Sequence, residues 1–200
     1  HLNLGSAMTL NYTSPIFLGF FLPFISHQKI KKSIFICTIV GFTGALLILD
    51  PHGEWQSWFA GLVGLVSGIG AALAYIHVIQ LSKLNEPDWR TVFYFTLVSS
   101  IGSGLWISFT DYQKLVWNDI WILIPLGLSA TIAQIAMTRA YRLGNSIVIG
   151  TLSYLAIVFS GIISLLYFNE TMRIEDVLGA LMIIISGAIA SNISLKSRIN

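Results

Sequence analysis

The sequence predicts an all-α protein, a polytopic bundle of transmembrane helices. Of its 200 residues, 55% are apolar and only 10% are charged, whereas average soluble domains carry about 25% charged residues. The apolar residues gather into seven runs, each long enough to cross a hydrocarbon core of roughly 30 Å. The runs lack the polar–apolar alternation of a membrane barrel. Each must therefore satisfy its backbone hydrogen bonds as a helix.

The predicted spans are joined by short polar connectors, which leave no room for a separate soluble domain. In order along the chain, the spans are Ala7–Ser26, Ser33–Leu49, Trp58–Ser82, Thr91–Thr110, Ile120–Thr138, Ser146–Phe168 and Glu175–Leu195. None carries a charge near its centre.

Local features of individual spans support their assignment as packed membrane helices. In the first span, Pro15 lacks a backbone donor and predicts a break in the helix. In the third, small residues recur every four positions and predict one face for close helix packing. These small residues are Ala60, Gly64, Gly68 and Ala72. Tryptophans near the span ends, such as Trp58, Trp89 and Trp117, are typical of an aromatic belt at the membrane interface.

The basic residues predict the orientation in the membrane, because cytoplasmic connectors carry an excess of Lys and Arg. One predicted side holds Lys29, Lys31, Lys32, Lys83, Arg90, Arg139, Arg142, Lys196 and Arg198, and the other holds Lys114 and Arg173. We therefore expect the first side, with the C-terminus, to be cytoplasmic. The protein is expected in the plasma membrane, the inner membrane of a bacterium.

An internal repeat indicates how the spans are related. Thr9-Leu10-Asn11-Tyr12 matches Thr151-Leu152-Ser153-Tyr154, and the connectors that follow the two stretches lie on opposite predicted sides. Inverted repeats of this kind build many secondary transporters. We expect residues 1–50 to be the last two helices of a first repeat and residues 58–197 to be a second repeat of five helices. The parent protein would then have ten helices, three of them upstream of His1.

Several short stretches resemble the EamA type of the drug/metabolite transporter superfamily. They are Thr138-Arg139-Ala140-Tyr141-Arg142-Leu143-Gly144, Leu152-Ser153-Tyr154-Leu155, Phe168-Asn169-Glu170 and Tyr12-Thr13-Ser14-Pro15-Ile16-Phe17. Gln28 departs from the family pattern, because it aligns with Glu170 where members commonly keep a glutamate in both repeats. The resemblance implies secondary transport, often export, of small metabolites or drugs through a cavity between two five-helix units.

Polar residues inside the predicted spans are the candidate site, because buried polar groups are costly in lipid. The candidate substrate-binding residues are Asn11, Tyr12, Ser14, Tyr75, Gln134, Thr138 and Tyr154. For Asn11, Gln134 and Tyr154, a cavity wall and a polar contact between helices are equally good interpretations. For Thr131 and Thr151 the pattern favours helix packing.

His77 is the one histidine within a predicted span, and histidine is the side chain that can most readily carry a coupling proton at physiological pH. A position at the membrane interface explains it better. The absence of Lys and Arg from the span centres disfavours a strongly anionic substrate. We therefore expect a small neutral, zwitterionic or amphipathic solute.

Other functions fit the sequence less well. An enzyme would need grouped His, Asp or Glu at membrane depth, and the four histidines are isolated. A lipid flippase or scramblase on the same scaffold stays open. We expect no cofactor, no metal and no nucleic-acid partner, since the formal net charge is only +2. The expected partners are the lipid bilayer and a small-molecule substrate, and a homodimer is compatible with the sequence.

Overall fold

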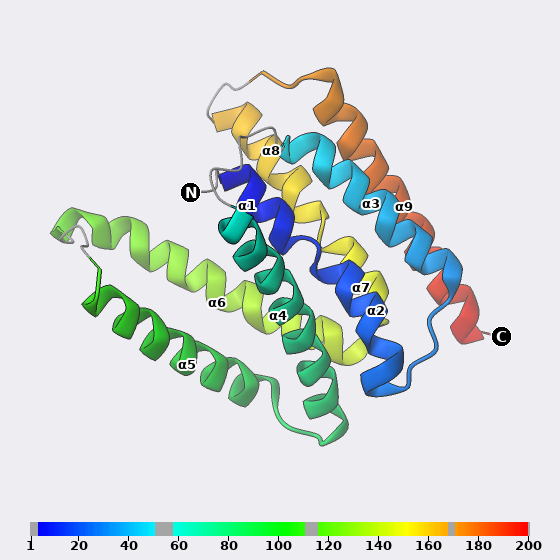
Figure 1. The fold of residues 1–200 in the computed structure, drawn as a ribbon, viewed down its shortest axis with the longest axis horizontal. Helices are drawn as coiled ribbons and strands as arrows, with labels where there is room; N and C mark the ends of the chain where they lie inside the picture. Colours follow the sequence, from blue (N-terminus) through cyan, green and yellow to red (C-terminus); the bar gives the residue numbers. More distant parts are fainter. Residues whose placement is uncertain (1–3, 51–57, 111–115, 168–170, 200) are drawn as a thin grey trace. The chain divides into compact units, whose positions relative to one another are not determined.

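The computed structural model describes residues 4–50, 58–110, 116–167 and 171–199, and these residues contain helices and no strand (Figure 1). The elements are α1 (Leu4–Asn11), α2 (Ser14–Ser26), α3 (Lys32–Leu49), α4 (Trp58–Lys83), α5 (Asp88–Ser108), the short 3₁₀ helix η1 (Trp117–Asp119), α6 (Ile120–Leu143), α7 (Ser146–Leu152), α8 (Leu155–Tyr167) and α9 (Ile174–Ile199). The motif residues 168–170 and the connector charges Glu54, Asp111 and Lys114 lie outside the described residues.

Seven helical segments of the described chain are long and apolar enough to cross a membrane, which confirms the predicted fold class. Two of these spans are each made of two helices, α1 with α2 and α7 with α8. The predicted connector 139–145 is largely wrong, because α6 continues to Leu143. Gly144 and Asn145 alone separate α6 from α7. The Asn145 side chain starts α7 by accepting the backbone N–H groups of Ile147 and Val148 at 3.2 and 3.3 Å.

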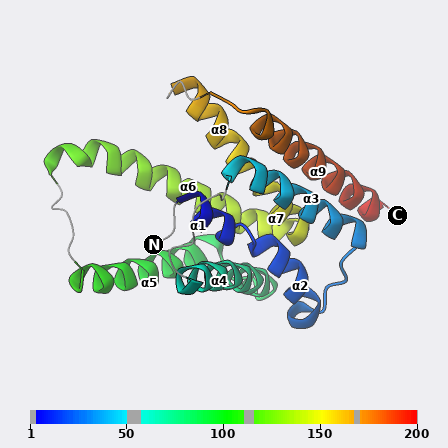
Figure 2. The same cartoon turned by 45° about the horizontal axis from the view of Figure 1, so that its top comes forward.

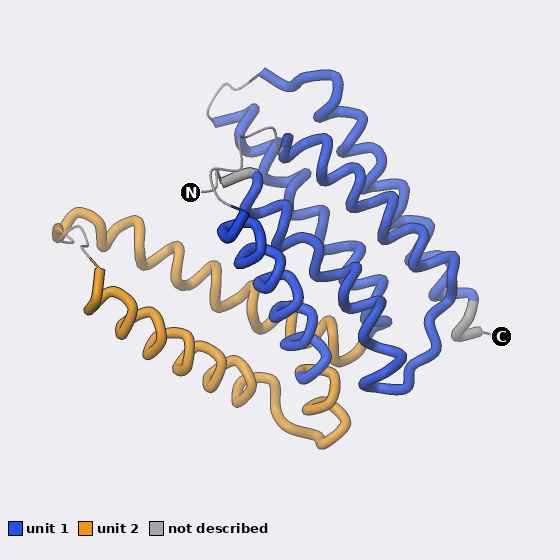
Figure 3. Tube along the Cα trace, in the orientation of Figure 1, with its two compact units in different colours: residues 1–77, 144–200 blue, residues 78–143 orange. Residues whose placement is uncertain are grey.

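The chain forms two compact units (Figure 3). The first unit contains residues 1–77 and 144–200, and the second contains residues 78–143. These units are defined by which residues pack together, whereas the repeats proposed from the sequence are defined by similarity between two stretches of the chain. The division of the chain into repeats stays a prediction.

The first unit is built around the antiparallel pair α3 and α9, which lie side by side in both ribbon views (Figures 1 and 2). A Cβ added at Gly44 would lie 2.5 Å from the Gly179 carbonyl oxygen, and one added at Gly179 would lie 2.5 Å from the Gly44 oxygen. Only glycine lets two helix backbones approach this closely. Gly41, earlier in α3, faces Ser186, later in α9, so the helices run in opposite directions.

Both two-part spans of the first unit are broken at the tyrosines that the repeat aligns, Tyr12 and Tyr154, although the two breaks differ by one residue in register. Between α1 and α2, Pro15 offers no N–H to the Asn11 carbonyl, and the Thr13 hydroxyl donates to the Leu10 carbonyl at 2.5 Å. This break confirms the prediction from Pro15. Between α7 and α8, no proline is present. There the Ser153 hydroxyl donates to the Gly150 carbonyl at 2.7 Å, a side-chain contact that competes with the helical pattern.

The second unit consists of the end of α4, α5, η1 and α6. Pro87 precedes α5, and Asp88 occupies its first turn, where a negative charge is favourable. Arg142 near the end of α6 donates to Asp88 at 2.7 Å. This half-buried ion pair joins the start of α5 to the end of α6.

Candidate functional site

The two helix breaks meet through a pair of tyrosines. The rings of Tyr12 and Tyr154 have their centroids 6.0 Å apart, at 55° to one another. The Tyr154 hydroxyl donates to the Tyr12 carbonyl oxygen at 3.3 Å, an acceptor that the break has removed from the helical ladder. Tyr154 has no exposed surface and packs in a core with Ala45 and Ile183. Tyr12 is half-buried.

Helix α4 packs against the first break along the predicted stripe of small residues. A Cβ added at Gly64 would lie 2.6 Å from Leu10, and one at Gly68 would lie 2.7 Å from the Leu10 carbonyl oxygen. Asn11 donates from its amide to the Ser67 hydroxyl at 2.8 Å. The exposed Asn11 is therefore held by α4.

The remaining candidates of the first unit are Ser14, Tyr75 and His77. Ser14 is buried in the first turn of α2. Tyr75 is half-buried on α4 and lies within electrostatic reach of Tyr12. The structure thus brings Tyr12, Tyr75 and Tyr154 close to the breaks. His77 is exposed and is the last residue of α4 that belongs to the first unit. Its proposed part in proton coupling stays a prediction.

The candidates on α6 belong to the second unit. Gln134 is half-buried and Thr138 is buried. Thr131 donates to the carbonyl of Gly127 on its own helix at 2.8 Å. In the first unit, the hydroxyls of Thr151 and Thr38 lie 2.7 Å apart and join α7 to α3. The Thr38–Thr151 contact is consistent with the packing role that the sequence favours for Thr151, whereas the bond of the exposed Thr131 stays within its own helix.

A pocket of about 630 Å³ lies next to Tyr12, within the range usual for small-molecule sites. Residues of α1, α3, α8 and α9 and of the segment before α9 line it, and most of them are apolar. Met8 and Tyr12 form one part of its wall, and Arg173 and Asp176 add charges. All of these residues belong to the first unit.

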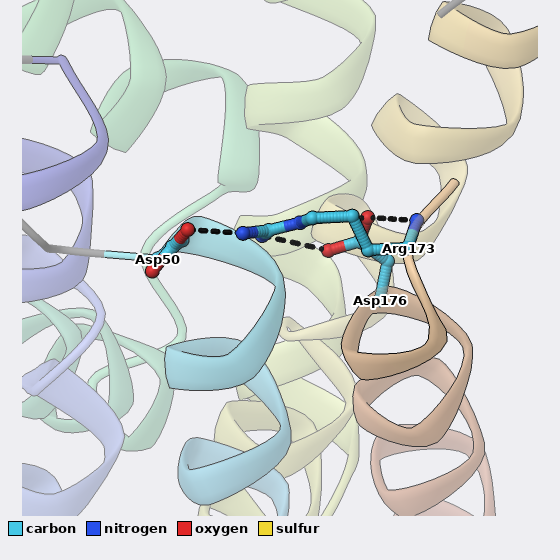
Figure 4. Close-up of polar contacts among 3 residues, drawn as sticks. All are labelled: Asp50, Arg173 and Asp176. Carbon is cyan, nitrogen blue, oxygen red and sulfur yellow. Dashed lines mark hydrogen bonds and ion pairs between the residues drawn. The ribbon is translucent and has the colours of Figure 1, made fainter. Parts of the chain in front are cut away.

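Three charged side chains meet where α9 begins (Figure 4), and two of them, Arg173 and Asp176, line the pocket. The Arg173 guanidinium donates to Asp50, which ends α3, and to Asp176 at 3.0 Å. Asp176 also accepts the Arg173 backbone N–H at 2.8 Å and so caps the start of α9. Hydrogen bonds with Asp176 and then with Asp50 raise the pKa of Arg173 above its usual value, so the residue stays charged. We call Asp50, Arg173 and Asp176 the charged node.

The sequence did not single out the charged node as a unit. Of its three members, the sequence analysis used only Arg173, as a basic residue on the predicted side opposite the C-terminus. Arg173 and Asp50 are 123 residues apart, and no local sequence pattern predicts an ion pair between such distant residues. The available signal was that the connectors after Leu49 and before Glu175 lie on the same side of the membrane in the predicted topology.

Comparison with known proteins identifies the family. The model of the EamA-like transporter family matches residues 58–192. The chain belongs to this family. This EamA-family chain is an integral, multi-pass membrane protein, as its seven apolar helices also indicate.

The relatives of this EamA-family chain are distant. It is 25% identical to the pseudopaline exporter of Pseudomonas aeruginosa, over 93% of this chain and 65% of the exporter. It is 23% identical to the riboflavin transporter of Brucella anthropi, over 92% of this chain and 66% of that protein. A solved crystal structure superposes with a TM-score of 0.85 at 16% identity, covering 97% of this chain and 69% of the other. The chain therefore spans about two thirds of the length of these relatives.

Proposed function

We propose that the complete protein is a secondary active transporter that exports a small neutral, zwitterionic or amphipathic solute by alternating access. The observation that carries this proposal is the pair of helix breaks at Tyr12 and Ser153, joined by the Tyr154–Tyr12 hydrogen bond. Discontinuous helices commonly form the substrate sites of secondary transporters, at the interface of inverted repeats. Family membership and the names of the relatives support transport.

The chemistry of the breaks supports an uncharged pathway. Asn11, Tyr12 and Tyr75 offer amide and phenol groups beside the first break, and the spans have no Lys or Arg near their centres. Such groups suit a solute that needs hydrogen bonds and aromatic walls rather than a fixed counter-charge. In this proposal Asn11, Tyr12 and Tyr75 contact the solute, while the fully buried Tyr154 holds the breaks together.

We also propose that the protein lies in the plasma membrane with its C-terminus in the cytoplasm. Lys31 precedes α3 and Arg173 precedes α9, and the antiparallel packing of these helices supports opposite sides for the two residues. Cysteines replacing Lys31 and the exposed Glu175, in a Cys37→Ser background, should react with an impermeant maleimide from opposite sides. Reaction of both from the same side would contradict the inverted arrangement.

A metabolite export screen with the complete protein tests the transport proposal. Cells that overproduce it should release at least one small solute faster than cells carrying an empty vector. The same solute should move across proteoliposomes that contain the purified protein. Transfer of labelled phospholipid between leaflets without movement of any soluble compound would instead support a lipid flippase or scramblase.

A further inference from the structure

We propose that a small basic pocket at one end of the first unit binds the phosphate group of an anionic membrane lipid. The pocket has a volume of about 120 Å³ and lies between the end of α2, the start of α3 and the start of α7. All of its lining residues belong to the first unit, and none of them belongs to the helix breaks. The lipid site is therefore additional to the proposed transport pathway.

The basic pocket has the size of a headgroup site. Leu22, Ile34 and Ile147 line it from α2, α3 and α7, and each of them is only 2% exposed. The connector between α2 and α3, together with Asn145, supplies the polar part of the lining. Sites for drug-sized ligands span about 300–1,000 Å³. The basic pocket is smaller, so it suits a single compact group such as a phosphate.

The polar groups of the basic pocket can donate hydrogen bonds to an anion. Lys29 and Lys31 contribute ammonium groups, which are donors without any acceptor. The Asn145 side-chain oxygen already accepts two backbone N–H groups of α7, which leaves its amide nitrogen to donate. Gln28 is half-buried in the pocket, and among the described residues its side chain has no hydrogen-bond partner.

The two lysines of the basic pocket lack counter-charges. Neither Lys29 nor Lys31 forms an ion pair within the described ranges of the chain. Lys31 also immediately precedes α3, which has no side-chain cap and no acidic residue in its first turn. The dipole of a helix favours an anion at this end. A bound phosphate would offset both the ammonium charges and the helix dipole.

The described carboxylates of the first unit lie at its other end. Asp50 follows α3, whose 18 residues extend over about 27 Å, and Glu175 and Asp176 lie in the first turn of α9. Because α9 runs antiparallel to α3, its first turn is remote from the start of α3 (Figures 1 and 2). In the second unit, the carboxylates of Glu86 and Asp88 are already paired with arginines of that unit.

The surroundings of the basic pocket favour a lipid over a soluble phosphate. Phe24 and Ile25 in the last turn of α2, and Ile36 near the start of α3, are exposed apolar side chains. In a membrane protein, acyl chains can cover such residues while the headgroup stays at the polar end of the helices. Lysines that flank a membrane span attract anionic lipids. A lipid thus satisfies the apolar and the basic residues together.

Thermal stabilisation by lipid tests the inference. The complete protein in dodecyl maltoside would be melted with increasing dioleoyl phosphatidylglycerol or dioleoyl phosphatidylcholine, which share their chains and differ in net charge. A ligand that binds only the folded protein raises the Tm as its concentration rises. We expect phosphatidylglycerol to reach its half-maximal effect at a concentration about tenfold lower, because choline neutralises the phosphate of the other lipid. Inorganic phosphate at the same concentrations should leave the Tm unchanged.

Variants of the basic pocket locate the effect. Lys29→Gln and Lys31→Gln should each raise the half-maximal concentration of phosphatidylglycerol about fivefold. Gln28→Glu should also raise it, because a carboxylate in the pocket repels the phosphate. Lys196→Gln is the matched control, since Lys196 is exposed near the end of α9 and does not line the pocket. Its half-maximal concentration should equal that of the parent protein in physiological salt, which screens distant charges.

Three results would overturn the inference. Equal half-maximal concentrations of the two lipids would remove the selection for a negative charge. Equal effects of Lys196→Gln and Lys31→Gln would assign the lipid to the basic surface as a whole and not to the pocket. Stabilisation by inorganic phosphate as strong as that by phosphatidylglycerol would make this a site for a soluble anion. None of these results bears on the proposed transport function, because the proposed solute contacts lie outside the basic pocket.

Discussion

The α3–α9 pair and the α5–α6 pair both consist of apolar helices of spanning length, yet they pack very differently. In the most apolar stretch of the α3 span 33% of residues are buried, against 6% for α5 and none for α6. The helices of both pairs contain glycines. Gly44 and Gly179 bring two backbones together, whereas a Cβ at Gly102, Gly104 or Gly127 would meet nothing within 4 Å.

This difference shows what stabilises helix pairs in a membrane. Lipid is as apolar as leucine, so burial of apolar surface gives little drive for association there. Close backbone approach and polar contacts must supply the affinity instead. The α3–α9 pair has the close approach of Gly44 and Gly179, and the charged node lies at one end of it. The α5–α6 pair relies on the ion pair of Asp88 and Arg142 at one end.

The largest expected effect is that of a methyl group added where the backbones of α3 and α9 meet. Gly44→Ala places a Cβ 2.5 Å from a backbone oxygen, which cannot move aside as a side chain could. We expect the free energy of unfolding to fall by about 3 kcal/mol. Gly102→Ala in α5 is the control and should be neutral or stabilising by up to about 1 kcal/mol. Unfolding in increasing dodecyl sulfate, followed by circular dichroism, measures both. Equal destabilisation by the two variants would refute the comparison.

A second effect concerns the tyrosine that joins the helix breaks. Tyr154→Phe removes the bond to the Tyr12 carbonyl and should lower the free energy of unfolding by about 1 kcal/mol. Because Tyr154 has no exposed surface, we expect the maximal transport rate to fall while the half-saturating solute concentration stays unchanged. Tyr167→Phe, at the exposed last residue of α8, should change neither. A rise in the half-saturating concentration would place Tyr154 in contact with the solute.

A smaller effect is expected for the threonines of α3. Thr38 and Thr43 each donate to the carbonyl four residues before them, but only Thr38 is paired with Thr151. Thr38→Val should cost about 0.6 kcal/mol, the average for a hydrogen bond between membrane helices. Thr43 faces outward, so Thr43→Val should leave the free energy of unfolding unchanged. Unfolding curves of the two variants, measured side by side, test this difference. Indistinguishable midpoints would show that the Thr38–Thr151 bond adds nothing to the stability of the protein.

The smallest effect is expected in the second unit. Arg142→Gln removes the half-buried pair with Asp88 and should cost about 0.5 kcal/mol, because partly exposed ion pairs contribute little. The exposed Arg139, on the same helix, provides the control Arg139→Gln. The loss should shrink in 1 M salt, which screens charges that water reaches. A salt-independent loss of several kcal/mol would mean that the pair is central to the unit.

Much of the fold could be predicted because membrane helices follow from length and apolarity. The seven spans needed no knowledge of packing, and Pro15 predicted the first break from its missing donor. The second break, at Ser153, carries no proline, so only its alignment with the first could have indicated it. The substrate contacts proposed for Gln134, Thr138 and the other polar residues stay predictions.

The sequence alone determined that this chain crosses a membrane as seven helices. In the bilayer, every apolar segment of sufficient length must satisfy its backbone hydrogen bonds internally, and a helix does so. Tertiary structure decided which glycines touch a neighbouring backbone, and it decided that Asp50, Arg173 and Asp176 form one node. The physical reason is distance. A close approach or an ion pair between residues more than a hundred positions apart depends on how whole helices cross, which no local pattern encodes.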